Sequence, residues 1–210
     1  MPTTHHHSID FFDEQFQRQA LAGDLALNPF EEAALPHLRG RVLDFGCGMG
    51  NLAVAAARRG CSVVALDASG AAINHLRQRA ILESLAIDAV QVDLRNHEVT
   101  EDFDTVVSIG LLMFFDCSTA LRCLANLQAC VREGGVAIIN VMIEGTTYMD
   151  MFEPDGYCLF PRLELERRFA GWDILHAEFR EFAAPDQKVK SFATLIARTP
   201  HEPRVPADIS

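Results

Sequence analysis

The chain has 210 residues, of which 49% are hydrophobic, and a formal net charge of −11. This length is typical of one domain with a full core, and the negative charge disfavours nucleic acid and anionic membranes as partners because both would repel the average surface. No run of about 18 apolar residues and no signal-peptide pattern is seen, so we expect a cytoplasmic protein without a membrane partner.

The six cysteines follow no CxxC spacing and no pairing rhythm. Zinc sites and disulfide frameworks are normally recognised by such spacing. The sequence therefore predicts reduced thiols and no metal site.

The N-terminal part predicts short helices ahead of the main fold. Residues 1–8 read as a disordered tail and residues 9–40 as a helical cap, because apolar residues recur at helical spacing between Ile9 and Ala20. Asn28 followed by Pro29 predicts the start of a second helix.

From residue 41 to residue 199, apolar strands alternate with helices, and residues 200–210 read as a second tail. The expected strands are RVLDF, CSVVALD, AVQVD, DTVVSIG and VAIINVM. They are too apolar to be half exposed, which predicts a parallel sheet covered on both faces. WDILHAEF and SFATLIAR predict an antiparallel hairpin at its edge. We therefore expect one α/β domain over 1–210, a doubly wound, Rossmann-like, mostly parallel sheet that ends in this hairpin.

Two helix boundaries inside this region also follow from the residues. Asn51 is a candidate N-cap for the alanine-rich helix after the first strand. Gly134 and Gly135 predict the end of the helix that begins at Cys117. Leu82 is expected on the buried face of the helix between the second and third strands.

The glycine turn after the first strand predicts a ligand site. RVLDFGCGMG ends in Gly46, Gly48 and Gly50, and backbone without Cβ lets a ligand approach closely. A dinucleotide fingerprint needs glycine where this chain has Asn51, and the acid Asp44 disfavours a pyrophosphate. An amino acid needs helix amides for its carboxylate and an acid for its ammonium, so the pattern favours an amino-acid ligand.

Two more acids end the next two strands. Asp67 stands where a carboxylate can bind ribose hydroxyls, and Asp93 can accept from an adenine amine, with Leu94 against the ring. One Asp at a strand end is more often a turn former. Three such acids beside a glycine turn predict an adenosyl amino acid.

The motifs LDFGCGMG, VVALDAS, VDLRN, FDTVVSIG and REGGVAIINVM resemble, in order and spacing, those of class I S-adenosylmethionine-dependent methyltransferases. The resemblance runs from about Phe11 to Arg198. More narrowly, FDTVVSIGLLMFFD, FPRLELERRFAGWDILHAEF and FATLIAR resemble the tellurite-resistance (TehB-like) methyltransferase group. The resemblance implies the class I methyltransferase fold, S-adenosyl-L-methionine as cofactor, S-adenosyl-L-homocysteine as product, and a small-molecule acceptor.

The resemblance also assigns residues to the parts of the cofactor. It implies a floor beside the sulfonium from Ile109, Gly110 and Leu111. It places Asp44, Gly46, Cys47, Gly48 and Gly50 around the methionine part, Asp67 and Ala68 at the ribose, and Asp93 and Leu94 at the adenine. Phe16 matches an aromatic residue that closes over the cofactor, with core packing as its alternative role.

The acceptor site is expected after the fourth and fifth strands and in the irregular region that follows. Arg162, His176 and Arg180 are the charged candidates for an anionic acceptor. The narrower family has a His-Arg pair in the terminal hairpin where this chain has Phe179 and Arg180, so only Arg180 is carried over. A soft anion such as a thiolate or a chalcogen oxyanion needs no strong general base.

Two other functions remain open. A module that binds S-adenosylmethionine or S-adenosylhomocysteine without turnover would carry the same motifs. A nicotinamide-dependent oxidoreductase is opposed by Asn51 at the third glycine position and by Asp44. No heptad pattern indicates an oligomeric state.

Overall fold

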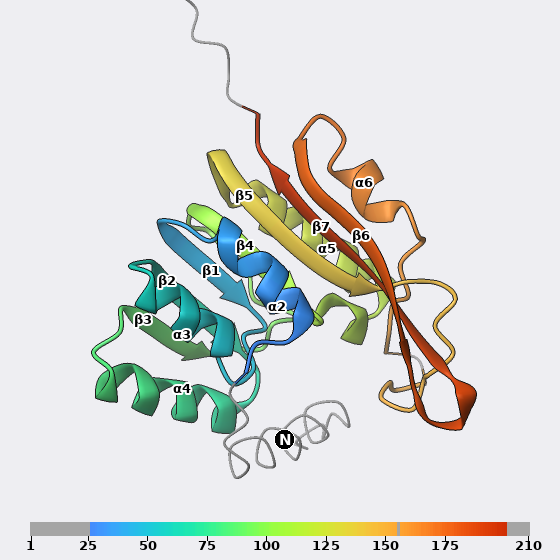
Figure 1. Ribbon diagram of the computed structural model, residues 1–210, viewed down its shortest axis with the longest axis horizontal. Coiled ribbons are helices and arrows are strands. Elements are labelled where there is room, and N and C mark those ends of the chain that lie inside the picture. Colours follow the sequence, from blue (N-terminus) through green and yellow to red (C-terminus); the bar gives the residue numbers. More distant parts are fainter. Residues whose placement is uncertain (1–25, 155, 201–210) are drawn as a thin grey trace, which may run out of the picture.

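A seven-stranded sheet forms the centre of the protein. The computed structural model describes residues 26–154 and 156–200, and its sheet has the strand order β3-β2-β1-β4-β5-β7-β6 (Figure 1). Strands β1 to β5 run parallel, whereas β7 is antiparallel to β5 and β6. The strands are β1 Arg41–Phe45, β2 Ser62–Asp67, β3 Ile87–Gln91, β4 Phe103–Ile109, β5 Val131–Met142, β6 Asp173–Ala183 and β7 Val189–Arg198. The expected mostly parallel sheet with a terminal hairpin is confirmed.

Helices cover both faces of this sheet. Helices α2, α3 and α4 pack on one face, and α5 and α6 pack on the other (Figure 1). The α-helices are α2 Pro29–Ala34, α3 Asn51–Arg58, α4 Gly70–Leu82, α5 Cys117–Ala129 and α6 Glu164–Arg168, and the 3-10 helices are η1 Leu35–His37, η2 Leu112–Phe114 and η3 Pro185–Gln187. Within the described ranges, no helix is long and apolar enough to cross a membrane.

The strands read as continuous apolar runs because alternate residues enter two different cores. Leu43 and Ile139 belong to the core on the α5 side, whereas Val42, Val107 and Ile138 belong to the core on the α3 side. Successive side chains of a strand point to opposite faces, so a strand covered on both faces needs apolar residues at every position. These two sets are called the α5-side core and the α3-side core below.

Asn28 starts α2 as the sequence predicts. Its side chain accepts hydrogen bonds from the amides of Phe30 (2.9 Å) and Glu31 (3.0 Å), and the Glu31 carboxylate accepts from the Asn28 amide (2.8 Å). Pro29 takes the first helical position, where its missing N–H is no loss. This capping box sets Phe30 and Glu31 over the α3 side of the sheet.

Three sequence-based details are wrong. The cap position of α3 is Gly50, and Asn51 is the first helical residue. Helix α5 ends at Ala129, not at Gly134 and Gly135, because β5 already begins at Val131 and pairs there with Phe103. Leu82 is 84% exposed at the end of α4. For α5, the pairing of β5 with β4 overrides the local glycine signal. For α3, the helix boundary lies one residue from the position that the local pattern predicts, and α4 ends at Leu82 itself.

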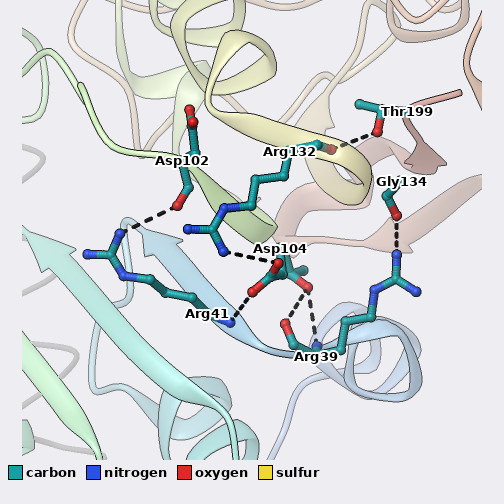
Figure 2. Close-up of polar contacts among 8 residues, drawn as sticks. Arg39, Arg41, Asp102, Asp104, Arg132, Gly134 and Thr199 are labelled. Carbon is teal, nitrogen blue, oxygen red and sulfur yellow. Dashed lines mark hydrogen bonds and ion pairs between the residues drawn. The ribbon is translucent and has the colours of Figure 1, made fainter. Parts of the chain in front are cut away.

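Asp104 joins the amino-terminal ends of three strands. Its carboxylate accepts from the Arg41 amide of β1 (2.7 Å) and from the Arg132 guanidinium of β5 (3.2 Å), as Figure 2 shows. Beside it, the Arg39 amide donates to Thr105 Oγ1 (3.2 Å), and the Arg39 guanidinium donates to the Gly134 carbonyl. The hydrogen bond from the Arg41 amide is the largest cause that holds the pKa of Asp104 below its usual value.

A disulfide links Cys117 to Cys158, contrary to the expectation of reduced thiols. Cys117 is the first residue of α5, and Cys158 lies between β5 and α6, where its amide donates to the Met113 carbonyl (3.0 Å). The sequence separation of 41 residues gives no local signal. The other four cysteines are free and buried, as expected for small apolar side chains.

We expect Asp104→Asn to destabilise the fold by about 1–2 kcal/mol at pH 7, because it weakens hydrogen bonds to a charged acceptor. A carboxyl whose folded pKa is depressed contributes stability above its unfolded pKa of 3.8, and that stability is lost as the pH falls below it. Urea denaturation at pH 7 and pH 3 measures this difference, which should shrink at pH 3. The exposed Asp88 is the matched control as Asp88→Asn, and equal midpoints for the two variants at pH 7 would contradict the role of Asp104.

We expect Cys117→Ser to lower the free energy of unfolding by about 4 kcal/mol, the chain-entropy value for a loop of this length. Thiol titration of the unfolded, unreduced protein should detect the four free cysteines, and the variant should add Cys158. Reduction should shift the unfolding midpoint of the wild type and leave that of the variant unchanged. Six reactive thiols in the unreduced wild type would show that the bond does not form.

Candidate functional site

Three loops meet at the carboxyl edge of the parallel sheet, where the strand order reverses around β1. The amides of Gly46 and Cys47 donate to the Leu66 carbonyl at the end of β2 (2.8 and 3.0 Å). Leu111, after β4, covers Gly46 so closely that a Cβ there would lie 2.7 Å from its side chain. Such a reversal point is where ligands bind in open α/β sheets.

The turn between β1 and α3 requires glycine. Gly46 and Gly50 have φ values of +88° and +72°, in the left-handed region that favours glycine. A Cβ on Gly50 would lie 2.5 Å from the Leu76 side chain of α4. Only a backbone without Cβ therefore fits between the neighbouring side chains at these positions. The turn leads directly into the amino-terminal end of α3, which attracts negative charge.

Asp44 is a buried acid next to this turn. Asp44 is 5% exposed, and its Oδ2 atom has no hydrogen-bond partner in the described part of the chain. Burial raises its pKa from 3.8 to about 8, and the nearby acids Glu31 and Asp67 add to that effect. An unpaired buried carboxyl is costly in a folded protein. The arrangement suits a cationic or hydrogen-bond-donating ligand group at Asp44.

Asp67 connects the glycine turn to the end of β2. Its Oδ2 accepts from the Gly48 amide and its Oδ1 from the Ser69 amide, each over 2.8 Å. The neighbouring Ala68 carbonyl accepts from Gln91 Nε2 (3.0 Å) at the end of β3. A carboxylate has about four acceptor positions, so Asp67 can keep these bonds and still accept from ligand hydroxyls.

Asp93 closes its own turn after β3. Its Oδ1 accepts from the Arg95 amide (3.1 Å) and its Oδ2 from Asn96 Nδ2 (2.8 Å), which is the turn-forming role that an isolated Asp commonly has. The Leu94 side chain is buried in the α5-side core with Phe45. A ligand at this end would therefore contact backbone groups of the turn and the outer side of the Asp93 carboxylate oxygens.

The loop after β4 is anchored on β5. The Gly110 amide donates to the Asn140 carbonyl (3.1 Å), and Ile109 packs against the α3-side core. Asn140 itself is fully buried; its Nδ2 donates to Thr194 Oγ1 (2.9 Å), while its Oδ1 has no partner among the residues described. Asn140 is not among the residues predicted from the sequence, although a polar residue inside the apolar run VAIINVM was a usable signal.

The strand register places Asp44 and Asn140 on the same face of the sheet. Asp44 lies opposite Val107 on β4, and Ile109, two positions further along β4, lies opposite Asn140. Paired residues share a face and alternate residues return to it. Two orphaned buried oxygens, Asp44 Oδ2 and Asn140 Oδ1, thus face the α3 side near the carboxyl edge.

An aromatic and methionine cluster lies beyond the ends of β4 and β5. Its partly exposed rim includes Phe152, whose ring is 5.1 Å from that of Phe114 and 5.2 Å from that of Tyr157. Its buried members are Met113, Phe114, Met142, Met151 and Phe192, and the partly buried residues packed on them are Phe30, Tyr148, Phe152, Leu159 and Phe182. The region after β4 and β5, where the sequence predicts the acceptor site, is therefore apolar and aromatic.

The structure separates the three charged candidates for the acceptor site. Arg180 donates to Glu178 Oε1 (2.8 Å), and His176 Nε2 lies 3.5 Å from Glu178 Oε2, so these two share a face of β6. Arg162 instead stacks on the Phe179 ring (4.4 Å), which packs against the α5-side core. His176 and Arg180 therefore lie on the face of Asp44 and Asn140, whereas Arg162 lies with the opposite face.

Two predicted cofactor residues, Cys47 and Phe16, and the question of a metal site remain. Burial raises the pKa of the Cys47 thiol well above its usual value, so this residue is no thiolate nucleophile. Phe16 lies outside the described residues. Across those residues no group of three or more His, Cys, Asp or Glu side chains is arranged to hold a metal ion.

Comparisons with known proteins agree with this geometry. The model of a family described as "Methyltransferase domain" matches residues 42–135. The chain is 28% identical to Hemagglutinin 1 of Eikenella corrodens over 66% of this chain and 45% of that protein. It is 24% identical to the probable S-adenosyl-L-methionine-dependent methyltransferase TehB of Haemophilus influenzae (strain 10810) over 90% of this chain and 66% of that protein. It thus spans less than two thirds of either relative.

A solved structure shows the same fold. The crystal structure of TehB from Haemophilus influenzae matches with a TM-score of 0.70 at 22% identity, over 91% of this chain and 67% of that chain. At 91% of this chain, the match extends well beyond residues 42–135, which the family model covers.

We expect Asp44→Asn to stabilise the protein at pH 8 by on the order of 2–4 kcal/mol. The folded protein keeps a proton on Asp44 up to about pH 8, whereas the unfolded chain loses it near 3.8. Stability therefore falls as the pH rises between these values, and asparagine removes that loss. Thermal and urea denaturation between pH 4 and pH 8 measure it: the variant's advantage should vanish at pH 4, and a destabilised variant at pH 8 would contradict the assignment.

Proposed function

Because the chain carries a class I S-adenosylmethionine-dependent methyltransferase domain, we propose that it transfers a methyl group from S-adenosyl-L-methionine to a small, soft acceptor such as a thiol or a chalcogen oxyanion. The observation that carries the proposal is the orphaned carboxyl of Asp44 beside a glycine turn that opens a helix. A zwitterionic amino acid offers the complementary charges, an ammonium for Asp44 and a carboxylate for the turn and the end of α3.

We assign the remaining parts of the cofactor by their place on the carboxyl edge. Asp67 would accept from the ribose hydroxyls beside Ala68, and the turn at Asp93 would receive the adenine. The loop of Ile109, Gly110 and Leu111 would lie under the sulfonium, because it is held against both the glycine turn and β5. Gly46, Cys47, Gly48 and Gly50 would surround the methionine part.

The protein's contribution to catalysis is then alignment and exclusion of water. The bound sulfonium supplies an activated methyl group, and an in-line displacement depends chiefly on holding the acceptor close and aligned. The aromatic and methionine cluster would keep water from one side of that region. A thiolate or an oxyanion arrives already nucleophilic, so no strong general base is needed. Arg180 donates to Glu178 through Nε alone, so its other guanidinium nitrogens, with His176 beside them, could contribute to the attraction of an anionic acceptor.

The first test measures cofactor binding by calorimetric titration of the protein with S-adenosylhomocysteine. We expect the wild type to bind and Asp44→Asn to lose at least tenfold in affinity, because a charged partner of the ammonium is removed. Since the same variant is expected to be more stable, its loss cannot be ascribed to unfolding. Asp88→Asn serves as the control. Binding that is unchanged in both Asp44→Asn and Asp67→Ala, or preferential binding of a reduced nicotinamide, would overturn the proposal.

The second test is a screen for the acceptor. Thiols, selenite, tellurite and amines are offered with S-adenosyl-L-methionine, and formation of S-adenosylhomocysteine is measured. We expect turnover with a soft acceptor and a higher KM in Arg180→Met. A protein that binds the cofactor product yet turns over no acceptor of any class would instead be a non-catalytic binding module.

A further inference from the structure

Five cations lie on the terminal hairpin or stack on it, and four of them are already engaged, among them Arg198, whose Nη1 lies 4.0 Å from Asp173 Oδ2. Arg180 is paired with Glu178, and Lys188 Nζ with both oxygens of Asp150 (2.8 and 3.0 Å). Arg162 stacks on Phe179 toward the α5 side. Lys190 differs: within the described ranges its ammonium has no carboxylate partner, and it lies 4.5 Å from the centre of the Tyr148 ring.

Lys190 stands just past the carboxyl end of β5. The last residue of β5, Met142, lies opposite Phe192 on β7. Lys190 comes two residues before Phe192, opposite Phe182. Because β7 is antiparallel to β5, Lys190 lies beyond the carboxyl end of β5. Alternation puts Lys190 and Phe192 on the same face. In Figure 1 the β6–β7 hairpin continues beyond the arrowhead of β5 on this side, which is the side where the glycine turn and the loop after β4 end.

Aromatic side chains surround this position. Phe182, the cross-strand partner of Lys190, has its ring 5.6 Å from that of Phe30, and Phe30 in turn lies 4.9 Å from Phe192. Tyr148 is fastened to β7, because its amide donates to the Val189 carbonyl (3.1 Å). Tyr148, Phe30 and Phe182 are all partly exposed. The ammonium therefore lies against the Tyr148 ring, among aromatic side chains that are only partly buried.

We propose that Lys190 binds an anionic group of the methyl acceptor, and that the acceptor is an organic anion with an apolar body of about aromatic size. This inference rests on the proposed function and narrows its acceptor class. Tyr148, Phe30 and Phe182, called the aromatic rim here, would contact the apolar body of the acceptor. Lys190 would contact its carboxylate or a similar anionic group. A bare inorganic oxyanion would leave the aromatic rim unused.

The physical reason is the charge balance of the hairpin. In a chain with a net charge of −11, carboxylates are abundant, and partly buried lysines are normally paired with one. Tyr148 can hold the ammonium by a cation–π contact without neutralising it. The positive charge thus stays available to an anion, and a hydrogen bond to a charged group contributes more than a neutral one.

The test measures binding of two matched fluorinated probes to the full chain saturated with S-adenosylhomocysteine. One probe is 4-(trifluoromethyl)benzoate and the other is 4-(trifluoromethyl)benzyl alcohol, which has the same ring without the charge, and fluorine NMR titration gives both affinities. We expect the wild type to prefer the benzoate and Lys190→Met to lose about tenfold in affinity for it. The alcohol should bind both proteins equally, and Lys190→Arg should retain most of the preference.

Lys188→Met is the matched control, because Lys188 lies on the same strand and near the same tyrosine ring but is paired with Asp150. It should leave the preference unchanged. Equal binding of the two probes to the wild type, or equal losses in Lys190→Met and Lys188→Met, would overturn the inference about Lys190 and leave the methyltransferase proposal standing. Failure of S-adenosylhomocysteine to saturate the wild type would overturn that proposal instead, and the inference with it.

Discussion

Strand β1 pairs in parallel with β2 on one side and with β4 on the other, and the rest of the site depends on this arrangement. Because parallel strands end at the same edge, the turns that follow β1, β2 and β4 are brought together. The hydrogen bond from the Gly48 amide to Asp67 then fixes one turn against the next. Leu111 closes the third side by packing on Gly46, which only glycine allows.

The same edge carries an energetic cost that fits a binding role. A carboxyl that is buried without a partner, as at Asp44, opposes folding at neutral pH. A ligand cation would supply the missing partner and lower the pKa of that carboxyl again. The glycine turn alone could be a structural feature, whereas the acid left unpaired beside it is difficult to explain by stability. Function is the more economical explanation of this pair of features.

The terminal hairpin adds what the parallel sheet lacks. Its antiparallel pairing with β5 carries β6 and β7 past the carboxyl end of that strand, so aromatic and charged side chains reach the region where a methyl acceptor would bind. The disulfide from Cys117 to Cys158 fastens the segment after β5 to the start of α5. In the proposed function, the donor would bind to loops of the first four strands, and the acceptor to the hairpin and this tethered segment.

Local patterns in the sequence were enough to predict the succession of strands and helices, the hairpin, the glycine turn and the three acids at strand ends. These are local patterns of period, turn chemistry and spacing, which survive without knowledge of contacts. The folded chain was needed to show that Asn140 shares a face with Asp44, that Arg162 lies on the opposite face from Arg180, that Lys190 has no carboxylate partner in the described chain, and that Cys117 meets Cys158. Each of these depends on which distant residues become neighbours when strands pair, and no spacing along the chain encodes that.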